Sequence, residues 1–152
     1  MSEPNLIMKC IRLMQFLKRK GIPILPKITQ WYIRITCSAD IPINISIGKG
    51  SVLKHNGLGV VLHEKALIGE NVVIMQNVTI GGRNGRGAPI IEDNVFIGAG
   101  ACVLGGIVVG KNVSIGANAV VLKSVPENAV IVGVPGKVVK ILEDNQIDRD
   151  EK

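Results

Sequence analysis

Aromatic residues are nearly absent from this sequence. One Trp, one Tyr and two Phe occur among 152 residues, although 47% of the chain is hydrophobic. The core must therefore be built from aliphatic side chains, which suits a structure that stacks similar residues at equivalent positions. The length allows one domain with a modest appendage.

Cysteine is also scarce. Cys10, Cys37 and Cys102 are odd in number and lack the CxxC spacing of zinc sites and redox motifs. This pattern argues against a disulfide scaffold and against a metal site. We therefore predict reduced thiols, no bound metal and a cytoplasmic location.

Long apolar runs are missing as well. No stretch approaches the roughly 20 residues of a membrane span, and the N-terminus has no signal-peptide core with a small-residue cleavage site. The net charge of +6 is concentrated at one end: residues 1–34 hold seven basic groups and one acidic group, whereas residues 35–152 hold eleven of each sign. A nucleic-acid-binding coil would carry its basic stripe along the main body, so we predict no nucleic-acid partner.

What the sequence does contain is an apolar residue at nearly every sixth position from residue 41 to residue 121. A period of six matches neither the 3.6 residues per turn of a helix nor the alternation of a strand. It indicates a coil that turns a corner every six residues and stacks its apolar residues into ladders. The positions are Ile41, Ile47, Leu53, Leu62, Ile68, Ile74, Ile80, Ile91, Ile97, Val103, Val109, Ile115 and Val121.

Other residue types follow the same period. Small or β-branched residues, such as Ala66 and Val113, stand four positions after most of these, and glycine, as at Gly48, follows about half of them directly. Glycine suits a corner because it accepts positive φ. A chance pattern is improbable over so many positions, and a βαβ arrangement needs helical crossovers that residues 41–135 do not encode. We therefore predict an all-β solenoid.

The N-terminal region follows a different pattern. Residues 3–20 place apolar residues at helical spacing between basic ones, and Gly21 and Pro23 end the pattern. We predict an amphipathic helix whose apolar face either packs on the coil or a neighbouring subunit, or docks weakly on a membrane surface. Residues 28–36 (ITQWYIRIT) are expected to form an extended strand that leads into the coil.

Two interruptions break the period. Nine residues separate Leu53 from Leu62, and eleven separate Ile80 from Ile91, which gives three and five extra residues. Insertions at the corners of solenoids often bind ligands. The predicted divisions of the chain are a basic N-terminal helix with its lead-in strand, the solenoid closed by a last strand, and a polar tail: 1–37, 38–142 and 143–152.

Three stretches of the repeat are specific: VVIMQNVTIGG, IGAGACVLG and IGANAVVLKSVP. With them, residues 38–141 resemble the hexapeptide-repeat acetyltransferases, and most of all the serine acetyltransferases, including the short relatives found with polysaccharide biosynthesis. The resemblance implies a single-stranded left-handed parallel β-helix, which departs from the usual right-handed crossover. It also implies a homotrimer that binds acetyl-CoA in a groove between subunits.

The resemblance assigns a catalytic pair. In IGKGSVLKHNGLG, His55 stands in the place of the family's catalytic histidine, and Asp40 of ADIPI stands in that of its aspartate partner. Fifteen residues are nearly one turn of three hexapeptides, so the two side chains are expected to meet on adjacent coils. Acetyl transfer from a thioester to a hydroxyl needs a base, and a histidine oriented by a carboxylate suits that role.

The same correspondence assigns the cofactor contacts. Backbone amides bordered by small residues allow a pantetheine arm to approach the coil edge closely. The expected contacts are Gly81, Gly82, Ala99 and Ala117, with Lys123 and Lys137, and further Lys140, Arg83 and Arg86, as candidates for the phosphates.

Three departures from the family concern the acceptor. We expect the long helical N-terminal domain of the cysteine-biosynthetic enzymes to be absent. Lys54 replaces the aspartate before the catalytic histidine, and Ala88 replaces a second histidine before a proline. His63 stands where these enzymes usually carry glycine, and we expect it to line the acceptor pocket. The acceptor is therefore either L-serine or a sugar hydroxyl of a surface-polysaccharide precursor, which would place the protein at the inner face of the membrane.

Two other functions are compatible with such a coil. A zinc enzyme of the γ-carbonic anhydrase type needs three histidine ligands per metal, and the chain has only His55 and His63. A non-catalytic scaffold is the other alternative, and it would be favoured if replacing His55 with alanine left the biological role intact. We predict an enzyme, an acetyl-CoA-dependent O-acetyltransferase.

Overall fold

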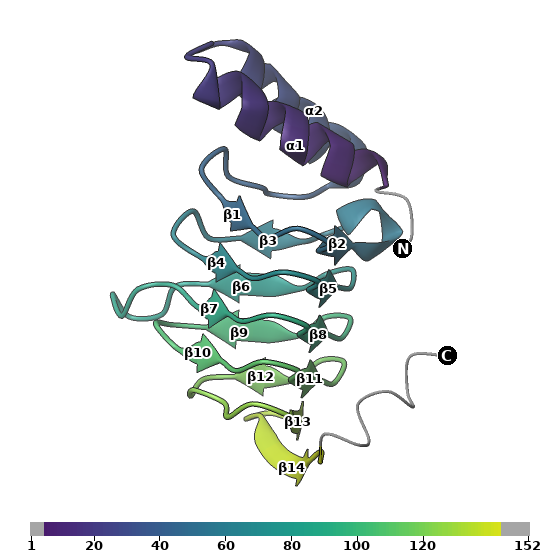
Figure 1. Ribbon diagram of the computed structural model, residues 1–152, viewed down its shortest axis with the longest axis vertical. Coiled ribbons are helices and arrows are strands. Elements are labelled where there is room, and N and C mark those ends of the chain that lie inside the picture. Colours follow the sequence, from purple (N-terminus) through teal and green to yellow (C-terminus); the bar gives the residue numbers. More distant parts are fainter. Residues whose placement is uncertain (1–4, 144–152) are drawn as a thin grey trace.

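The computed structural model describes residues 5–143, which form a parallel β-solenoid with two helices at its N-terminal end (Figure 1). Each full coil contributes one short strand to each of three sheets. The first sheet contains β1 (Ser46–Ile47), β4 (Leu67–Ile68), β7 (Ile90–Ile91) and β10 (Val108–Val109). The second contains β2 (Val52–Leu53), β5 (Val73–Ile74), β8 (Phe96–Ile97), β11 (Ser114–Ile115), β13 (Ala129–Val132) and β14 (Lys137–Ile141). The third contains β3 (Val61–Leu62), β6 (Thr79–Gly81), β9 (Cys102–Leu104) and β12 (Val120–Val121). The predicted solenoid is confirmed.

The strand register measures the length of each coil. In the first sheet, Ser46 pairs with Leu67, and Leu67 pairs with Ile90. Ile90 in turn pairs with Val108. The steps are 21, 23 and 18 residues (67 − 46, 90 − 67 and 108 − 90). An uninterrupted coil therefore takes three hexapeptides, and the two longer coils contain the three and five extra residues predicted from the sequence.

The apolar ladders form the core of the solenoid. Every position of the six-residue period is buried, with no more than 5% of the residue exposed. The positions four residues later are buried too, except Asn84 in the second insertion, so an uninterrupted hexapeptide sends two residues inward. Ser51 is the one buried polar side chain among the described residues. Its hydroxyl donates to the carbonyl of Gly69 at 2.8 Å and accepts from the backbone nitrogen of Val72 at 3.0 Å, so it is satisfied.

The glycines that directly follow the apolar positions of the period are required for a reason other than the predicted positive φ. None of them, Gly48 and Gly98 included, has positive φ. A Cβ on Gly98 would lie 2.6 Å from the backbone nitrogen of Ala117 on the next coil, so close approach between coils requires glycine there. Positive φ falls instead later in the corners, on asparagines and on other glycines such as Gly50 and Gly100. Four of the asparagines form a column of side-chain hydrogen bonds: Asn71, Asn94, Asn112 and Asn128.

We predict that Gly98→Ala destabilises the solenoid by about 3 kcal/mol, because the backbone of the adjacent coil cannot move aside as a flexible side chain can. Urea unfolding of the purified protein measures the loss. Gly81→Ala is the matched control, since the nearest atom to its added Cβ would be 3.3 Å away, in the side chain of Leu104. Equal stability of the two variants would contradict the steric explanation.

Two helices precede the solenoid, where the sequence predicted one helix and a strand. α1 (Leu6–Arg19) begins after Asn5, whose side chain accepts a hydrogen bond from the backbone nitrogen of Met8 at 3.3 Å. α2 (Leu25–Cys37) includes all of the predicted lead-in strand, so that prediction is wrong. Pro26 in the first turn favours a helix start. The apolar residues of this segment also fit a spacing of three and four, which its β-branched and aromatic composition obscured.

The apolar face of α1 packs on the solenoid and against α2. Arg12 of this helix also donates hydrogen bonds to the carbonyl oxygens of Ile47 and Gly48, both at 2.7 Å. Packing on the coil is therefore the role that the structure shows for this face. No described helix is long and apolar enough to cross a membrane. Four side chains of the face are at most 2% exposed: Ile7, Met8, Ile11 and Met14.

The other end of the solenoid is closed by an antiparallel pair, β13 and β14. All five residues of β14 are exposed. The predicted polar tail, residues 143–152, lies outside the described residues except for its first residue.

Candidate active site

His55 lies in the first insertion, at the corner between the second and third sheets. The extra residues form a short 3-10 helix, η1 (Lys54–Gly57), between β2 and β3. His55 and Asn56 both adopt positive φ, 51° and 52°. Gly57 is buried beneath them, since a Cβ there would lie 2.5 Å from Cδ1 of Ile7 in α1, and the other residues of η1 are exposed. The insertion thus presents the imidazole to solvent on a turn that packs against α1.

Asp40 begins the third sheet, next to β3. Its backbone forms an isolated parallel bridge with Val61, and its carboxylate accepts a hydrogen bond from Nη2 of Arg34 at 3.1 Å. This ion pair is substantially exposed, so it contributes less than about 1 kcal/mol to stability. The hydrogen bonds within residues 5–143 include none between Asp40 and His55. Sequence reasoning missed Arg34, which approaches Asp40 because residues 25–37 are helical.

Ala99 and Ala117 occupy the same corner as His55 on later coils. Ala99 lies between β8 and β9, and Ala117 lies between β11 and β12. The two corners are joined by a hydrogen bond from the backbone nitrogen of Asn118 to the carbonyl of Ala99, at 2.8 Å. Gln76 occupies this corner one coil before Ala99, and its Oε1 is buried without a hydrogen-bond partner. We call this column the His55 edge: His55, Gln76, Ala99 and Ala117.

The second insertion lies at the next corner, between the third and first sheets. Gly81 ends β6, and the loop starts at Gly82. Nδ1 of His63 accepts a hydrogen bond from the backbone nitrogen of Lys65 at 3.1 Å, so the proton of the neutral imidazole lies on Nε2. This Nε2 lies 3.4 Å from the position that a Cβ on Gly82 would occupy. Lys123 follows β12 at the same corner. We call this column the Gly82 edge: His63, Gly81, Gly82 and Lys123.

The loop of residues 83–89 folds back against the following corner. Gly106 approaches the carbonyl oxygen of Arg86 so closely that no Cβ fits between them. Arg83 and Arg86 are exposed, as expected for candidates that bind phosphate. Ala88 is half-buried and packs against the core.

One chain does not bring the two edges together. They border opposite sides of the third sheet, with η1 on the right of the view and the loop of residues 83–89 on the left (Figure 1). Lys137 belongs to neither edge, because it lies on β14, where it pairs with Val132. A single chain therefore does not assemble all of the predicted contacts in one groove.

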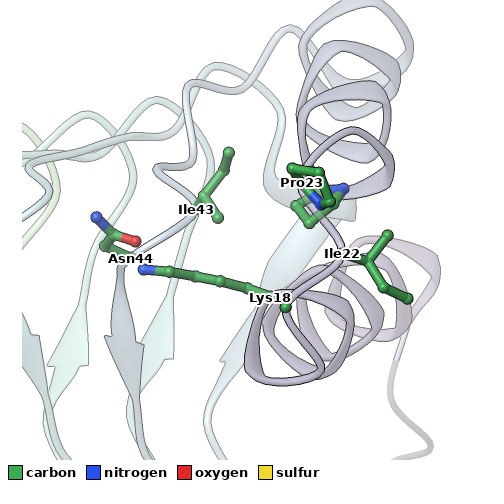
Figure 2. Close-up of a pocket in the computed structure, with 7 residues that line it drawn as sticks. Lys18, Ile22, Pro23, Ile43 and Asn44 are labelled. Carbon is green, nitrogen blue, oxygen red and sulfur yellow. The ribbon is translucent and has the colours of Figure 1, made fainter.

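A pocket of about 410 Å³ lies elsewhere, between the end of α1 and the segment before β1 (Figure 2). Lys18 extends across it toward Asn44. None of the predicted site residues lines this pocket. Its lining residues are Lys18, Gly21, Ile22, Pro23, Pro26, Ile43 and Asn44.

Among residues 5–143, two ionisable groups have a shifted pKa, and both lie away from these edges. Burial raises the pKa of the Cys10 thiol, and the nearby Cys37 adds to the shift. A hydrogen bond from the backbone nitrogen of Glu70 lowers the pKa of Asp93, and Lys111 contributes through its charge. Within the described part of the chain, no group of three or more His, Cys, Asp or Glu residues is placed to hold a metal ion.

Comparison with known proteins agrees with the solenoid fold. Residues 88–123 match the family described as "Bacterial transferase hexapeptide (six repeats)". The serine acetyltransferase of Synechococcus elongatus is 38% identical over 133 residues, which cover 86% of this chain and 54% of that protein. The chain belongs to the hexapeptide-repeat serine acetyltransferase family.

Solved structures of this family share the fold. The serine acetyltransferase from Vibrio cholerae matches with a TM-score of 0.84 and 35% identity, over 96% of this chain and 58% of that one. The enzyme from Brucella abortus, solved in complex with coenzyme A, matches with a TM-score of 0.83 and 34% identity, over 90% of this chain and 55% of that one. The chain thus spans little more than half the length of the family members it matches.

Proposed function

We propose that this chain is an acetyl-CoA-dependent O-acetyltransferase of the serine acetyltransferase type. The observation that carries the proposal is the likeness, over 90% of the chain, to a serine acetyltransferase solved with coenzyme A. The three unpaired cysteines support a cytoplasmic location.

In the proposed reaction, His55 acts as the general base. The acceptor hydroxyl attacks the thioester carbonyl while a nitrogen of His55 takes its proton, and the tetrahedral intermediate then expels the CoA thiolate. That thiolate takes up a proton, so the products are an acetyl ester and CoA. A positioned base contributes about 10² to 10⁴-fold to such a step. The exposed place of His55 on η1 supports this role, because an acceptor can reach it.

We assign Asp40 to the orientation of His55. Asp40 bridges Val61, the first residue of β3, and η1 leads directly into that strand. This shared attachment supports a pairing between carboxylate and imidazole once the acceptor site is filled. Arg34, which now holds the carboxylate at 3.1 Å, would exchange partners.

The cofactor would lie along both edges. Backbone amides of Ala99 and Ala117 on the His55 edge, and of Gly81 and Gly82 on the Gly82 edge, would bind the pantetheine arm, with Lys123 and Lys137 near the phosphates. Because one chain separates these edges, we propose that a homotrimer joins the His55 edge of one subunit to the Gly82 edge of the next.

The acceptor is either L-serine or a sugar hydroxyl of a polysaccharide precursor. Lys54, exposed beside His55, puts a positive charge where an aspartate is expected in a serine site. His63 presents an N–H donor at Gly82, which suits a neutral polyol. These two residues favour a sugar as the second candidate acceptor.

A thiol-release assay tests the proposal. The purified protein is incubated with acetyl-CoA and either L-serine, amino sugars, nucleotide sugars or oligosaccharides. We expect CoA release that depends on one acceptor class. Release with L-serine alone would eliminate the sugar acceptor. No release with any hydroxyl acceptor, although CoA still binds, would leave the non-catalytic scaffold.

A further inference from the structure

One face of α2 is apolar and uncovered. The residues buried on this helix, Pro26, Ile33 and Cys37, lie on the side that faces the rest of the chain. At 100° per residue, the exposed apolar residues fall within about 120° of one another on the opposite side. Contiguous exposed apolar surface of this kind marks an interaction site. We call it the α2 stripe, and its exposed fractions are Ile24 67%, Leu25 46%, Ile28 52%, Trp31 64%, Tyr32 43% and Ile35 59%.

The surroundings of the α2 stripe are positively charged. Residues 5–37 contain seven Lys and Arg residues and no Asp or Glu. By helical spacing, Lys27 and Arg34 flank the stripe along one side. Lys20, just after α1, is exposed, and its ammonium lies 5.8 Å from the centre of the Phe16 ring. An occupant of the stripe therefore combines apolar contact with negative charge.

We infer that the α2 stripe docks on an anionic lipid surface. An interfacial helix buries its apolar side chains at the boundary between headgroups and acyl chains, while flanking lysines bind anionic headgroups. Trp31 and Tyr32 are the residue types that prefer this boundary, because each joins an apolar ring to a polar group.

Charge argues against a second copy of this chain as the occupant. Two stripes face to face would bring together two helix pairs that carry seven basic residues each, of which only Arg34 forms an ion pair among the described residues, with Asp40. Like charges in a closed interface repel each other strongly. An anionic membrane has the complementary charge.

The sequence suggested a membrane contact through the helix of residues 3–20, whereas the structure favours α2. The apolar face of α1 is buried on the solenoid, with Ile7 and Ile11 completely covered, and is not available to lipid. α2 lies at the opposite end of the molecule from β14, so docking there leaves both solenoid edges open (Figure 1). The inference does not depend on the acetyl-transfer proposal.

Trp31 is the only tryptophan of the chain, so its fluorescence reports on the stripe directly. The full chain is mixed with vesicles of phosphatidylcholine and phosphatidylglycerol in equal amounts, or of phosphatidylcholine alone. We expect a blue shift of the Trp31 emission and co-sedimentation with the mixed vesicles only. Added salt is expected to weaken binding, because it screens the lysines.

The double variant Ile28→Ser/Ile35→Ser keeps the reporter and removes two apolar side chains. We expect it to bind the mixed vesicles at least about tenfold more weakly. Val139→Ser, on the far strand β14 and also 59% exposed, is the matched control and should bind as the wild type does. Equal binding by the double variant would overturn the inference. A second result would also overturn it. In that result, the Trp31 emission of the wild type is already blue-shifted and shielded from acrylamide without vesicles, and the wild type has a larger mass by light scattering than the double variant. The stripe would then join copies of the chain.

Discussion

Replacing His55 with asparagine is expected to lower the rate of CoA release by at least about 100-fold, the lower limit for loss of a positioned general base. Asparagine is the informative replacement because residue 55 has φ of 51°. Asparagine tolerates this left-handed conformation, whereas alanine adds backbone strain. The variant therefore removes the base and keeps the turn. Steady-state thiol release with the acceptor found by the screen measures the effect.

Two controls separate chemistry from structure. CoA affinity, measured by calorimetry, should be unchanged, because the proposed cofactor contacts are backbone amides on other residues. Asn56→Gly changes the neighbouring residue, which also has positive φ, and should retain most of the activity. A His55→Asn variant that keeps more than about a tenth of the wild-type rate would exclude His55 as the general base.

The fold was predictable because burial in a solenoid repeats. Each apolar residue of the period, such as Ile74 or Ile97, meets the same neighbours one coil away, so one rule applies to every coil. The same rule located the insertions, because a skipped position shows where residues have been added. Counting the residues between apolar positions thus predicted a coil of three hexapeptides, the length that the pairing of Ile90 with Val108 shows.

The N-terminal region was harder, because no repeat constrains it. The segment ITQWYIRIT contains β-branched and aromatic residues that favour strands, and its apolar residues fit helical spacing as well. This segment is helical in the structure, where α2 packs against α1 and Ile33 is completely buried. Tertiary contacts of this kind outweigh local propensity. The error also concealed Arg34, the residue that contacts Asp40.

The corner glycines show a related limit. In the sequence, Gly98 looks like a turn residue. In the structure, glycine is required there because the backbone of Ala117 on the next coil leaves no room for a Cβ. A local sequence pattern does not reveal such a contact between coils. Positive φ falls on other glycines, such as Gly100, and on asparagines such as Asn94, which tolerate this conformation and also bond to one another between coils.

The candidate site was predictable residue by residue but not as an assembly. Family correspondence selected His55, Gly82, Ala99 and Ala117 separately. The structure then divides them between two edges, because successive corners of a three-sided coil point in different directions. His63 acquires its orientation from the backbone of Lys65, and that contact is visible only once the corner is folded.

This division gives the last prediction, on mixed subunits. His55→Asn and Gly82→Trp should each be nearly inactive alone, the first without a base and the second with the Gly82 edge blocked. If each site takes the His55 edge from one subunit and the Gly82 edge from its neighbour, unfolding and refolding the two variants together in equal amounts restores intact sites. The His55 edge is intact in half of the subunits and the Gly82 edge in the other half, so about a quarter of the sites combine two intact edges. We therefore expect thiol release to recover to about a quarter of the wild-type rate.

Matched refolding controls decide the outcome. Each variant refolded alone should stay inactive, and wild type refolded alone should regain full activity, which corrects for losses during refolding. Gly85→Asn mixed with His55→Asn is the neutral pairing. Gly85 lies in the same loop as Gly82, has nothing within 4 Å of an added Cβ, and has a φ of 70° that asparagine tolerates. This mixture should therefore show about half of the wild-type rate. A mixture of the two inactive variants that stays inactive would mean that one chain supplies the whole site, because no recombination of subunits could then repair it.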